Sequence, residues 1–311
     1  MQNFANENQT IVDLIFTPFL IANINSISCH KYGKFFAIET VKHTPQEQLL
    51  SLLQHLHPDF ISICSDNEGL KVIKAIIERS LSFFYKASTQ SLSLVPFLYA
   101  LVYVSSNIIE LMTNRQSANA NIISYLISYD ISFINEILYQ IIASNLIRIA
   151  NSKHGVSKLI CILKLSPTFN YGHYIVKQVT VETNMSKIIC DQFERYLIYY
   201  VLEHMRFNYC SDIINYLINN FIECATHKYS SFIIEQCVLK QGLLSEQLLD
   251  VNNVRELAVS SIGYHLLISV LQSNANSIRE TQVNLKKIIC KVKKSIRDTE
   301  TGQKVIKEAQ K

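Results

Sequence analysis

Glycine and proline are scarce in this sequence, which has seven glycines and five prolines among 311 residues. β-Sandwiches and barrels need frequent turn residues, and doubly wound α/β folds need phosphate-binding glycines, so both classes are disfavoured. Because 49% of the residues are hydrophobic, the chain still has ample apolar material for a core, which excludes a wholly disordered chain. We therefore predict an all-α protein.

Motifs for catalysis or metal binding are equally sparse. The eight cysteines are scattered singly, without a CxxC pair, and no histidine lies at the spacing of a zinc site. The sequence has no glycine-rich phosphate loop, no GxSxG motif and no pair of carboxylates placed for acid–base chemistry. We expect no enzyme activity, no cofactor, no metal, and cysteines that stay reduced.

The apolar runs are too short to cross a membrane. The most apolar stretch, residues 92–104, has 13 residues and is interrupted by Ser93 and Pro96, whereas a spanning helix needs about 20 residues. The apolar run near the N-terminus contains Asp13 and Pro18 and lacks a basic leader, so we expect no signal peptide. These features predict a soluble intracellular protein without a membrane partner.

Positive charge is concentrated at the C-terminal end. The net charge is only +4, but residues 286–311 contain 9 of the 29 Lys and Arg residues and 3 of the 25 Asp and Glu residues. The first 285 residues therefore hold 20 basic and 22 acidic residues. The basic end is either an anion-binding surface or a solvated terminal helix, and charge alone favours neither.

An internal repeat organises the chain. Each copy has a polar turn that ends at one residue, which we call the anchor, and continues with two variable positions and with pairs of apolar residues. The eight anchors are Gly33, Gly69, Asn119, Gly155, Glu194, Ser230, Gly263 and Gly302. Their spacings of 36, 50, 36, 39, 36, 33 and 39 residues are typical of a helical solenoid with one insertion.

Every copy predicts a helix with one buried face. The apolar residues follow the anchor at the third, fourth, seventh and eighth positions, as Ile233, Ile234, Cys237 and Val238 do in the sixth copy. Residues with this spacing share one side of a helix. Each unit therefore predicts two or three short helices.

The copies extend over nearly the whole sequence, which predicts a single domain over residues 1–311. The insertion before the third copy is expected near residues 79–96, whose serine-rich part suits a surface loop. Residues 286–311 are expected to form a basic C-terminal repeat or cap. The third copy has a rival frame at residues 105–110.

The RNA-binding repeats of the Pumilio (PUF) family resemble two segments of the chain, DQFERYLIYYVLEH (191–204) and HKYSSFIIEQCV (227–238). Two further segments resemble them less closely, ELMTNRQSANANIISYLI (110–127) and IRIANSKHGVSKLICILK (147–164). The resemblance implies an all-α fold, a right-handed, armadillo-like α-solenoid or crescent of about eight three-helix repeats. It also implies that each repeat reads one RNA base with two or three side chains.

In the family, the first position after the anchor and the fifth contact a base edge, and the second stacks between bases. The sixth copy then offers Ser231 and Glu235 for the edge and Phe232 for stacking, which is the family's combination for guanine. The other expected edge residues are Arg195, Tyr199 and Gln303, the other stacking residues are Tyr196, His265 and Phe35, and the expected phosphate contacts are Lys71, Lys74, Lys158, Lys304 and Lys307. Alternatively, the aromatic residues pack between adjacent repeats.

The other copies depart from the family's edge pairs. Arg195 with Tyr199 replaces the usual amide-bearing pair in the fifth copy, and Ile160 and Ile268 occupy edge positions in the fourth and seventh. An isoleucine side chain has no group that reads a base edge. A conventional eight-base code is therefore in doubt.

Three functions remain open on the sequence. The resemblance implies a monomeric cytoplasmic protein that binds single-stranded RNA, typically in messenger 3′ untranslated regions, and recruits deadenylation or translational repression factors. A second hypothesis is a nucleolar factor that binds ribosomal precursor RNA through the basic C-terminal end. A third is a protein-interaction scaffold that has lost RNA binding, favoured by the apolar residues Val156, Ile160 and Ile268 on the expected reading face.

Overall fold

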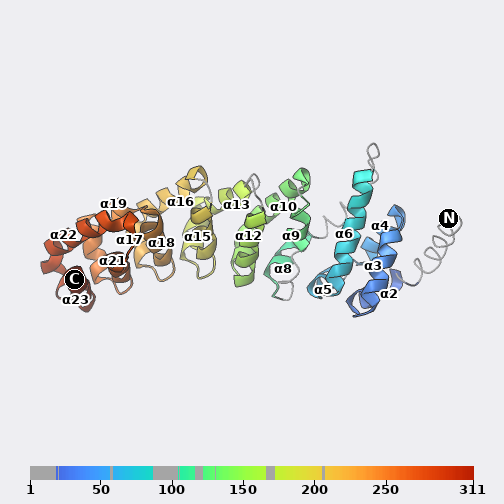
Figure 1. Cartoon of the computed structure of the whole chain (residues 1–311), viewed down its shortest axis with the longest axis horizontal. Helices are drawn as coiled ribbons and strands as arrows, with labels where there is room; N and C mark the ends of the chain where they lie inside the picture. Colours follow the sequence, from blue (N-terminus) through green and yellow to red (C-terminus); the bar gives the residue numbers. More distant parts are fainter. Residues whose placement is uncertain are drawn as a thin grey trace. The chain divides into compact units, whose positions relative to one another are not determined.

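The computed structural model describes residues 19, 21–56, 59–86, 104, 106–115, 122–129, 131–165, 172–204 and 207–311. All regular secondary structure in these ranges is helical (Figure 1). The contacts divide the chain into two compact units where the sequence predicted one domain. In a solenoid each repeat contacts only its neighbours, so a division into such units is expected even within a continuous array.

Unit 1 comprises residues 1–145 and 157–165, and unit 2 comprises residues 146–156 and 166–311. The helices described in unit 1 are α2 (Ile21–Cys29), α3 (Gly33–His43), α4 (Gln46–Leu56), α5 (Phe60–Ser65), α6 (Gly69–Lys86), α8 (Ile108–Thr113), α9 (Ile122–Ile127) and α10 (Ser132–Ser144). The boundary between the units falls within α12 (Lys153–Leu165). The helices of unit 2 are α11 (Leu146–Ala150), α13 (Gly172–Val179), α14 (Glu182–Cys190), α15 (Arg195–His204), α16 (Phe207–Asn219), α17 (Phe221–Thr226), α18 (Ser231–Gln241), α19 (Ser245–Leu248), α20 (Val251–Val259), α21 (Gly263–Gln272), α22 (Arg279–Ile296) and α23 (Glu300–Ala309).

One helix begins within three residues of each anchor, and we call these eight the anchor helices. They are α3, α6, α9, α12, α15, α18, α21 and α23. In copies two to six, all four apolar positions of the repeat are buried, whereas Phe36, Leu271 and Ile306 remain partly exposed in the first, seventh and eighth copies. The buried pairs therefore form the core that the repeat pattern predicted, and the fold is an all-α solenoid.

The structure decides the register of the third copy. Ile122, Ile123, Leu126 and Ile127 are buried, which are the positions expected from the Asn119 anchor. The rival frame lies instead at the start of α8, the short helix that precedes the anchor turn. Copies two, four and six have nine residues from the start of the preceding helix to the anchor, and the third copy has eleven. This spacing is longer by two residues, which explains why two frames competed.

The predicted insertion begins later than expected. α6 continues through Lys86, so residues 79–86 are helical and not part of a loop. Arg79 lies on this extension, and its guanidinium donates two hydrogen bonds to the carbonyl oxygen of Thr44, at 3.2 and 3.1 Å. Residues 87–96 of the expected loop lie outside the described residues.

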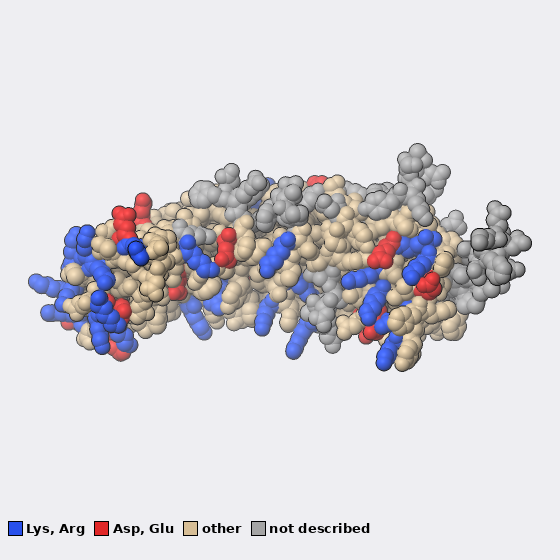
Figure 2. Space-filling view, in the orientation of Figure 1, with Lys and Arg blue, Asp and Glu red and all other residues tan. Residues whose placement is uncertain are grey.

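The charge pattern also has a structural counterpart. Lysine and arginine side chains gather over α22 and α23 at the C-terminal end of unit 2 (Figure 2). Within the described ranges, no single helix has the length and apolar composition needed to cross a membrane, and only α20 with α21, bent by 110° at their junction, meets these criteria as a pair. No group of three or more His, Cys, Asp and Glu side chains in the same ranges is arranged to hold a metal ion.

Candidate nucleic-acid interface

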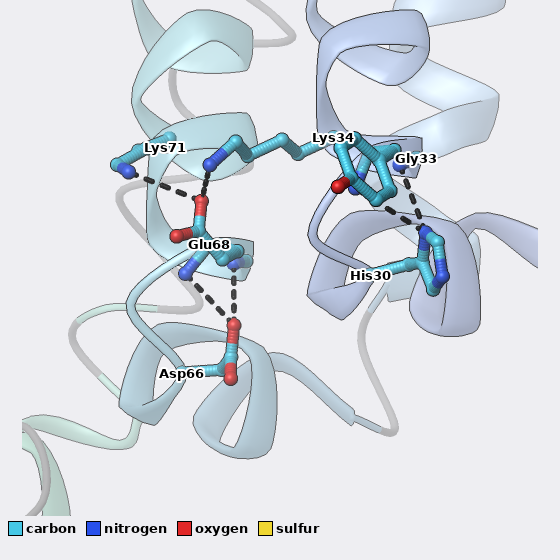
Figure 3. Close-up of polar contacts among 8 residues, drawn as sticks. His30, Gly33, Lys34, Asp66, Glu68 and Lys71 are labelled. Carbon is cyan, nitrogen blue, oxygen red and sulfur yellow. Dashed lines mark hydrogen bonds and ion pairs between the residues drawn. The ribbon is translucent and has the colours of Figure 1, made fainter.

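The turn before each anchor helix has a common device that the sequence analysis missed. The residue three positions before the anchor has a side-chain acceptor, and in each described copy it receives a backbone N–H of the turn. Asp66 Oδ1 accepts from Gly69 at 2.8 Å, and His30 Nδ1 accepts from Gly33 at 3.1 Å (Figure 3). The equivalent residues in later copies are Ser152, Asp191, His227, Ser260 and Thr299. These bonds satisfy amide donors that a helix start leaves unpaired and so set where the helix begins.

Close packing leaves no room for a side chain at two of the glycine anchors, Gly155 and Gly302. A Cβ atom on Gly155 would lie 1.8 Å from the carbonyl oxygen of Ile149, and one on Gly302 would lie 2.0 Å from that of Ile296. The sixth copy uses Ser230, whose hydroxyl donates to the carbonyl oxygen of Cys224 at 2.7 Å. The fifth copy buries Glu194, and burial followed by the charge of Asp191 raises the pKa of this carboxyl to about 7.

Accessibility after the anchor differs between copies. The first position is buried in the first, second and fourth copies, where it is Lys34, Leu70 and Val156. It is accessible in the fifth to eighth copies, where it is Arg195, Ser231, Tyr264 and Gln303. The fifth position is partly or fully exposed in every copy, and the second is exposed in every copy where it is described except the sixth, where Phe232 is half-buried. Both predicted edge positions are therefore accessible in α15, α18, α21 and α23.

The sixth copy presents the predicted guanine pair on one side of α18. Ser231 and Glu235 are both half-buried and lie one helical turn apart, which places their side chains next to each other. Glu235 forms no ion pair with any described residue. Its carboxylate is therefore available as a hydrogen-bond acceptor.

An aromatic cluster joins the fifth and sixth copies. The ring of Phe232 lies 6.0 Å from that of Tyr196 and 5.6 Å from that of Tyr199, measured between centroids. The guanidinium of Arg195 lies over the rings of Tyr196, Tyr229 and Phe232, at 4.9, 5.3 and 5.6 Å. The predicted stacking residues Tyr196 and Phe232 thus contact each other between adjacent repeats, and Tyr196 remains 43% exposed.

Tyr199, a predicted edge residue, also belongs to a polar network. Lys240 Nζ donates to its hydroxyl and forms an ion pair with Glu203 at 3.1 Å. The Tyr199 hydrogen bond and the Glu203 carboxylate raise the pKa of Lys240. The same three residues line a pocket of about 220 Å³ between α15 and α18, together with Gln236 and Cys237.

The first two copies arrange their lysines differently. Lys34, at the first position of α3, is 7% exposed and forms an ion pair with Glu68, which precedes α6 (Figure 3). Lys71, a predicted phosphate contact, pairs with the same carboxylate at 3.0 Å. Lys74 is half-buried, with its ammonium 4.7 Å from the centroid of the Tyr125 ring. Phe35, a predicted stacking residue, is 63% exposed.

Lys158 was wrongly predicted as a phosphate contact. Its side chain is 6% exposed, and its Nζ donates to the carbonyl oxygens of Leu111 at 2.6 Å and Asn114 at 3.2 Å. Burial lowers the pKa of Lys158 to about 8. The lysine satisfies carbonyl groups at the C-terminal end of α8. Its place in the sequence, third after the anchor, is a buried position in copies two to six and was the signal that should have excluded it.

The remaining predicted residues lie on α21 and α23. His265 is exposed, with its ring 4.0 Å from that of Tyr264. Gln303 is exposed, and its Nε2 donates to the carbonyl oxygen of Arg297 at 3.1 Å. Lys304 pairs with Glu300 at 2.6 Å, while Lys307 is exposed. Val156 is buried and is not part of an exposed face, which removes one apolar residue that favoured a protein scaffold.

Comparison with known proteins gives the same family in sequence and in structure. No protein-family model matches the chain. The chain is 23% identical over 242 residues to Pumilio homolog 11 of Arabidopsis thaliana, an alignment that covers 76% of the chain and 40% of the relative. It is 21% identical over 315 residues to a Pumilio domain-containing protein of Schizosaccharomyces pombe, covering 96% of the chain and 42% of the relative. The chain thus spans about two fifths of the length of these curated relatives.

Three solved structures show the likeness in fold. The Puf4 RNA-binding domain has a TM-score of 0.68 at 17% identity, covering 98% of this chain and 94% of that domain. The yeast Puf5p RNA-binding domain has a TM-score of 0.67 at 17% identity, with coverage of 98% and 89%. The S. pombe Puf1 domain has a TM-score of 0.64 at 13% identity, with coverage of 93% and 75%. The chain is similar in sequence to Pumilio (PUF) proteins and has the all-α solenoid fold of these solved RNA-binding domains.

Proposed function

We propose that this chain binds single-stranded RNA in a sequence-selective way, through the outward positions of α15, α18, α21 and α23. The observation that carries the proposal is that both edge positions of these four helices are accessible, with the Ser231 and Glu235 pair on α18. Solved relatives support it, because the Puf4 domain is bound to a 3′ UTR recognition sequence of the HO endonuclease RNA and the Puf5p domain is bound to SMX2 RNA.

The sixth copy selects guanine in this proposal. The Watson–Crick edge of guanine offers N–H donors, and an ionised carboxylate with a serine hydroxyl offers acceptors for them. Glu235 is free of ion pairs with described residues, so its acceptor capacity is not spent within the protein. A neighbouring base stacks on the exposed part of Tyr196, and stacking on an aromatic side chain is worth about 1–3 kcal/mol per base.

The recognised motif is short. The first edge position is buried in the first, second and fourth copies, so these copies read no base through it. Ile268 supplies no polar group in the seventh copy, and Gln303 with Lys307 supplies both donors and an acceptor in the eighth. We expect the fifth to eighth copies to define no more than about four bases, one per repeat.

The cellular role proposed is control of messenger RNA through 3′ untranslated regions. A monomer in the cytoplasm would bind its site and bring deadenylation or translational repression factors to the transcript. The 3′ UTR sequence bound by the Puf4 domain supports this role by analogy. The nucleolar alternative differs from it in the RNA that is bound, which is ribosomal precursor RNA. The scaffold alternative binds no RNA.

Selection of RNAs from a random single-stranded pool tests the proposal. The wild-type chain should enrich a short motif with one essential guanine, and the Ser231→Ala/Glu235→Ala variant should lose the preference for that base. Glu235→Gln is sharper, because an amide donates as well as accepts, and we expect the preference to move from guanine to adenine. Glu256→Ala is the matched control, since it removes one exposed carboxylate from α20, which has no predicted base contact.

Each other result selects another function. Binding without an enriched motif contradicts code-based recognition and favours the nucleolar hypothesis of binding through charge. No RNA binding, by a chain shown to be folded by circular dichroism, leaves the interaction scaffold. An enriched motif that the Ser231→Ala/Glu235→Ala variant keeps would place the reading site elsewhere.

A further inference from the structure

α22 is a basic helix on which no predicted base-contacting position lies. It runs from Arg279 to Ile296 between α21 and α23 and packs against α20, α21 and α23. Its buried residues are Thr281, Leu285, Ile289, Val292 and Ile296. Their spacing of four, four, three and four residues places them on one side of the helix, so its apolar face is already covered.

The opposite side of α22 is a row of lysines, Lys287, Lys291 and Lys294, all of them exposed. They are four and three residues apart and therefore follow one line along the helix, over about 10 Å at a rise of 1.5 Å per residue. Lys286 and Lys293 flank this row, and Glu280, in the first turn, is the single acidic residue of the helix. We call these five lysines the α22 lysine face.

Most of the charge of this face is not neutralised by described residues, and only Lys286 among its lysines contributes to lowering the pKa of a described carboxyl, that of Glu308. Other lysines are paired, as Lys304 is with Glu300 at 2.6 Å and Lys311 is with Glu308 at 2.8 Å. The five lysines of the α22 lysine face form no ion pair with any described residue. Like charges four residues apart on a helix destabilise it, so the face gains most from an anionic ligand.

The composition of α22 distinguishes between anionic ligands. A helix that binds a membrane surface inserts an apolar face, but the apolar face of α22 is buried, and its exposed apolar residues are limited to Val283, 53% exposed, and Cys290. The helix has no aromatic residue, so it offers no platform for unstacked bases. Lysines are flexible point charges that hold phosphates without reading bases. Paired RNA turns its bases inward and presents phosphates, which matches this chemistry.

We propose that the α22 lysine face binds the phosphate backbone of a paired RNA segment, independently of base sequence. The inference rests on the proposed function, in which the anchor helices bind a single-stranded segment, and adds a second contact for structured RNA beside it. The chain then prefers a single-stranded site that is flanked by a stem. The stem adds affinity by charge, and the single strand sets specificity.

The experiment measures the affinity of the full chain for two RNAs by fluorescence anisotropy. One is a blunt duplex of about 16 base pairs, the length that a double-stranded-RNA domain spans, and the other is a short single strand with the selected motif. The test variant is Lys287→Gln/Lys291→Gln/Lys294→Gln. The matched control, Lys153→Gln/Lys177→Gln/Lys187→Gln, removes three exposed lysines that lie on other helices.

The test variant should bind the duplex at least about tenfold more weakly, with a salt dependence shallower by about 2 to 3 in the slope of log K against log salt, at about 0.7–0.9 per lost phosphate contact. The control variant and a Lys287→Arg/Lys291→Arg/Lys294→Arg variant should keep wild-type duplex binding. The single strand should bind the test variant as well as it binds the wild type, whereas Ser231→Ala/Glu235→Ala should do the reverse. Failure of the proposed function and failure of this inference thus give different results.

Three results would overturn the inference. Equal losses in the test and control variants would show that net charge, and not this face, attracts the duplex. A wild-type chain that does not bind the duplex would show that paired RNA is not the ligand of this face. Binding to phosphatidylserine vesicles that is lost in the test variant, in a chain that ignores the duplex, would assign the face to membranes.

Discussion

The first two copies and the fifth and sixth copies share the same turn and the same buried positions, but they differ in the polar residues that follow the anchor. In unit 1, the first position of α3 is Lys34, buried and ion-paired with Glu68. In unit 2, the equivalent positions of α15 and α18 are Arg195 and Ser231, both accessible. Both pairs of copies share the turn acceptor and the buried apolar positions. The fold of each copy is thus set by buried residues, and the outward positions differ in residue type without changing that fold.

The largest expected effect separates the aromatic residues of the two regions. Phe232→Ala should weaken binding of the selected RNA by about 1–3 kcal/mol, because its ring contacts both Tyr196 and Tyr199 and supports the stacking surface. Phe35→Ala removes the equivalent ring in the first copy and should cost much less, because the edge position beside it is buried. Anisotropy titrations of both folded variants provide the comparison, and equal losses would contradict it.

The next largest effect is expected from removing the ion pair between Lys34 and Glu68. Glu68→Gln should lower the thermal unfolding midpoint, because it leaves a buried ammonium without its carboxylate. Burial lowers the pKa of Lys34 from its ordinary value of 10.5, so the ammonium loses its proton more readily than in the unfolded chain, and the loss of stability should shrink as the pH rises toward that value. Glu235→Gln, the same change on α18, should leave the midpoint unchanged. A loss that grows with pH would argue against a buried charge.

A smaller effect, on the pH dependence of stability, is expected at the anchor of the fifth copy. This anchor is the ionisable Glu194, whereas the anchor of the second copy is Gly69. The pKa of Glu194 is raised from 4.5 to about 7, so the folded state binds its proton more tightly than the unfolded chain does. This stabilisation is present below pH 4.5 and is lost as the pH rises through 7. Glu194→Gln removes this dependence, so the variant should gain about 1–2 kcal/mol on the wild type between pH 5 and pH 8, after allowance for solvent screening.

Urea denaturation at the two pH values measures the Glu194 effect. Glu223→Gln, which changes an exposed glutamate of α17, is the control and should follow the wild type at both values. A Glu194→Gln variant whose stability relative to the wild type does not change with pH would show that the carboxyl is already ionised without cost.

The smallest expected effect tests the cation among the rings. Arg195→Lys keeps the charge but loses the planar guanidinium that lies over Tyr196, Tyr229 and Phe232. We expect a loss of about 0.5–1 kcal/mol in the free energy of unfolding, the value of a partly exposed cation–π contact. For Lys34→Arg in the first copy, we expect the change in the free energy of unfolding to come instead from the buried ion pair with Glu68. Urea titrations of both variants measure this free energy. An Arg195→Lys variant that is as stable as the wild type would show that the cation–π contacts of this cluster do not stabilise unit 2.

Much of the repeat was readable from sequence because it depends on local spacing. The anchors, the buried face of each helix and the Asn119 register all follow from residues within about ten positions of each other. The extension of α6 through Lys86 was missed, because serine residues suggested a loop while the apolar face of the helix continued to Leu81. The turn acceptors at Asp66 and its equivalents were also readable, but their residue types vary and hid the pattern.

The candidate site was less predictable because its chemistry depends on partners from other copies. Lys158 was predicted as a phosphate contact and Lys34 occupies an edge position, yet Lys34 pairs with Glu68 and Lys158 with carbonyl groups of α8. These partners lie 34 and more than 40 residues away in sequence. No local pattern contains that information.

The sequence by itself determined the all-α repeat, its period near 36 residues, the family resemblance and the Ser231 and Glu235 pair. These properties follow from helical periodicity and from residue chemistry within one copy. Tertiary structure decided that the first edge position is buried in copies one, two and four and accessible in copies five to eight, and it left Lys287, Lys291 and Lys294 of α22 without a described ion-pair partner. The physical reason is that burial and ion pairing are set by neighbouring repeats, which the solenoid brings together from distant parts of the chain.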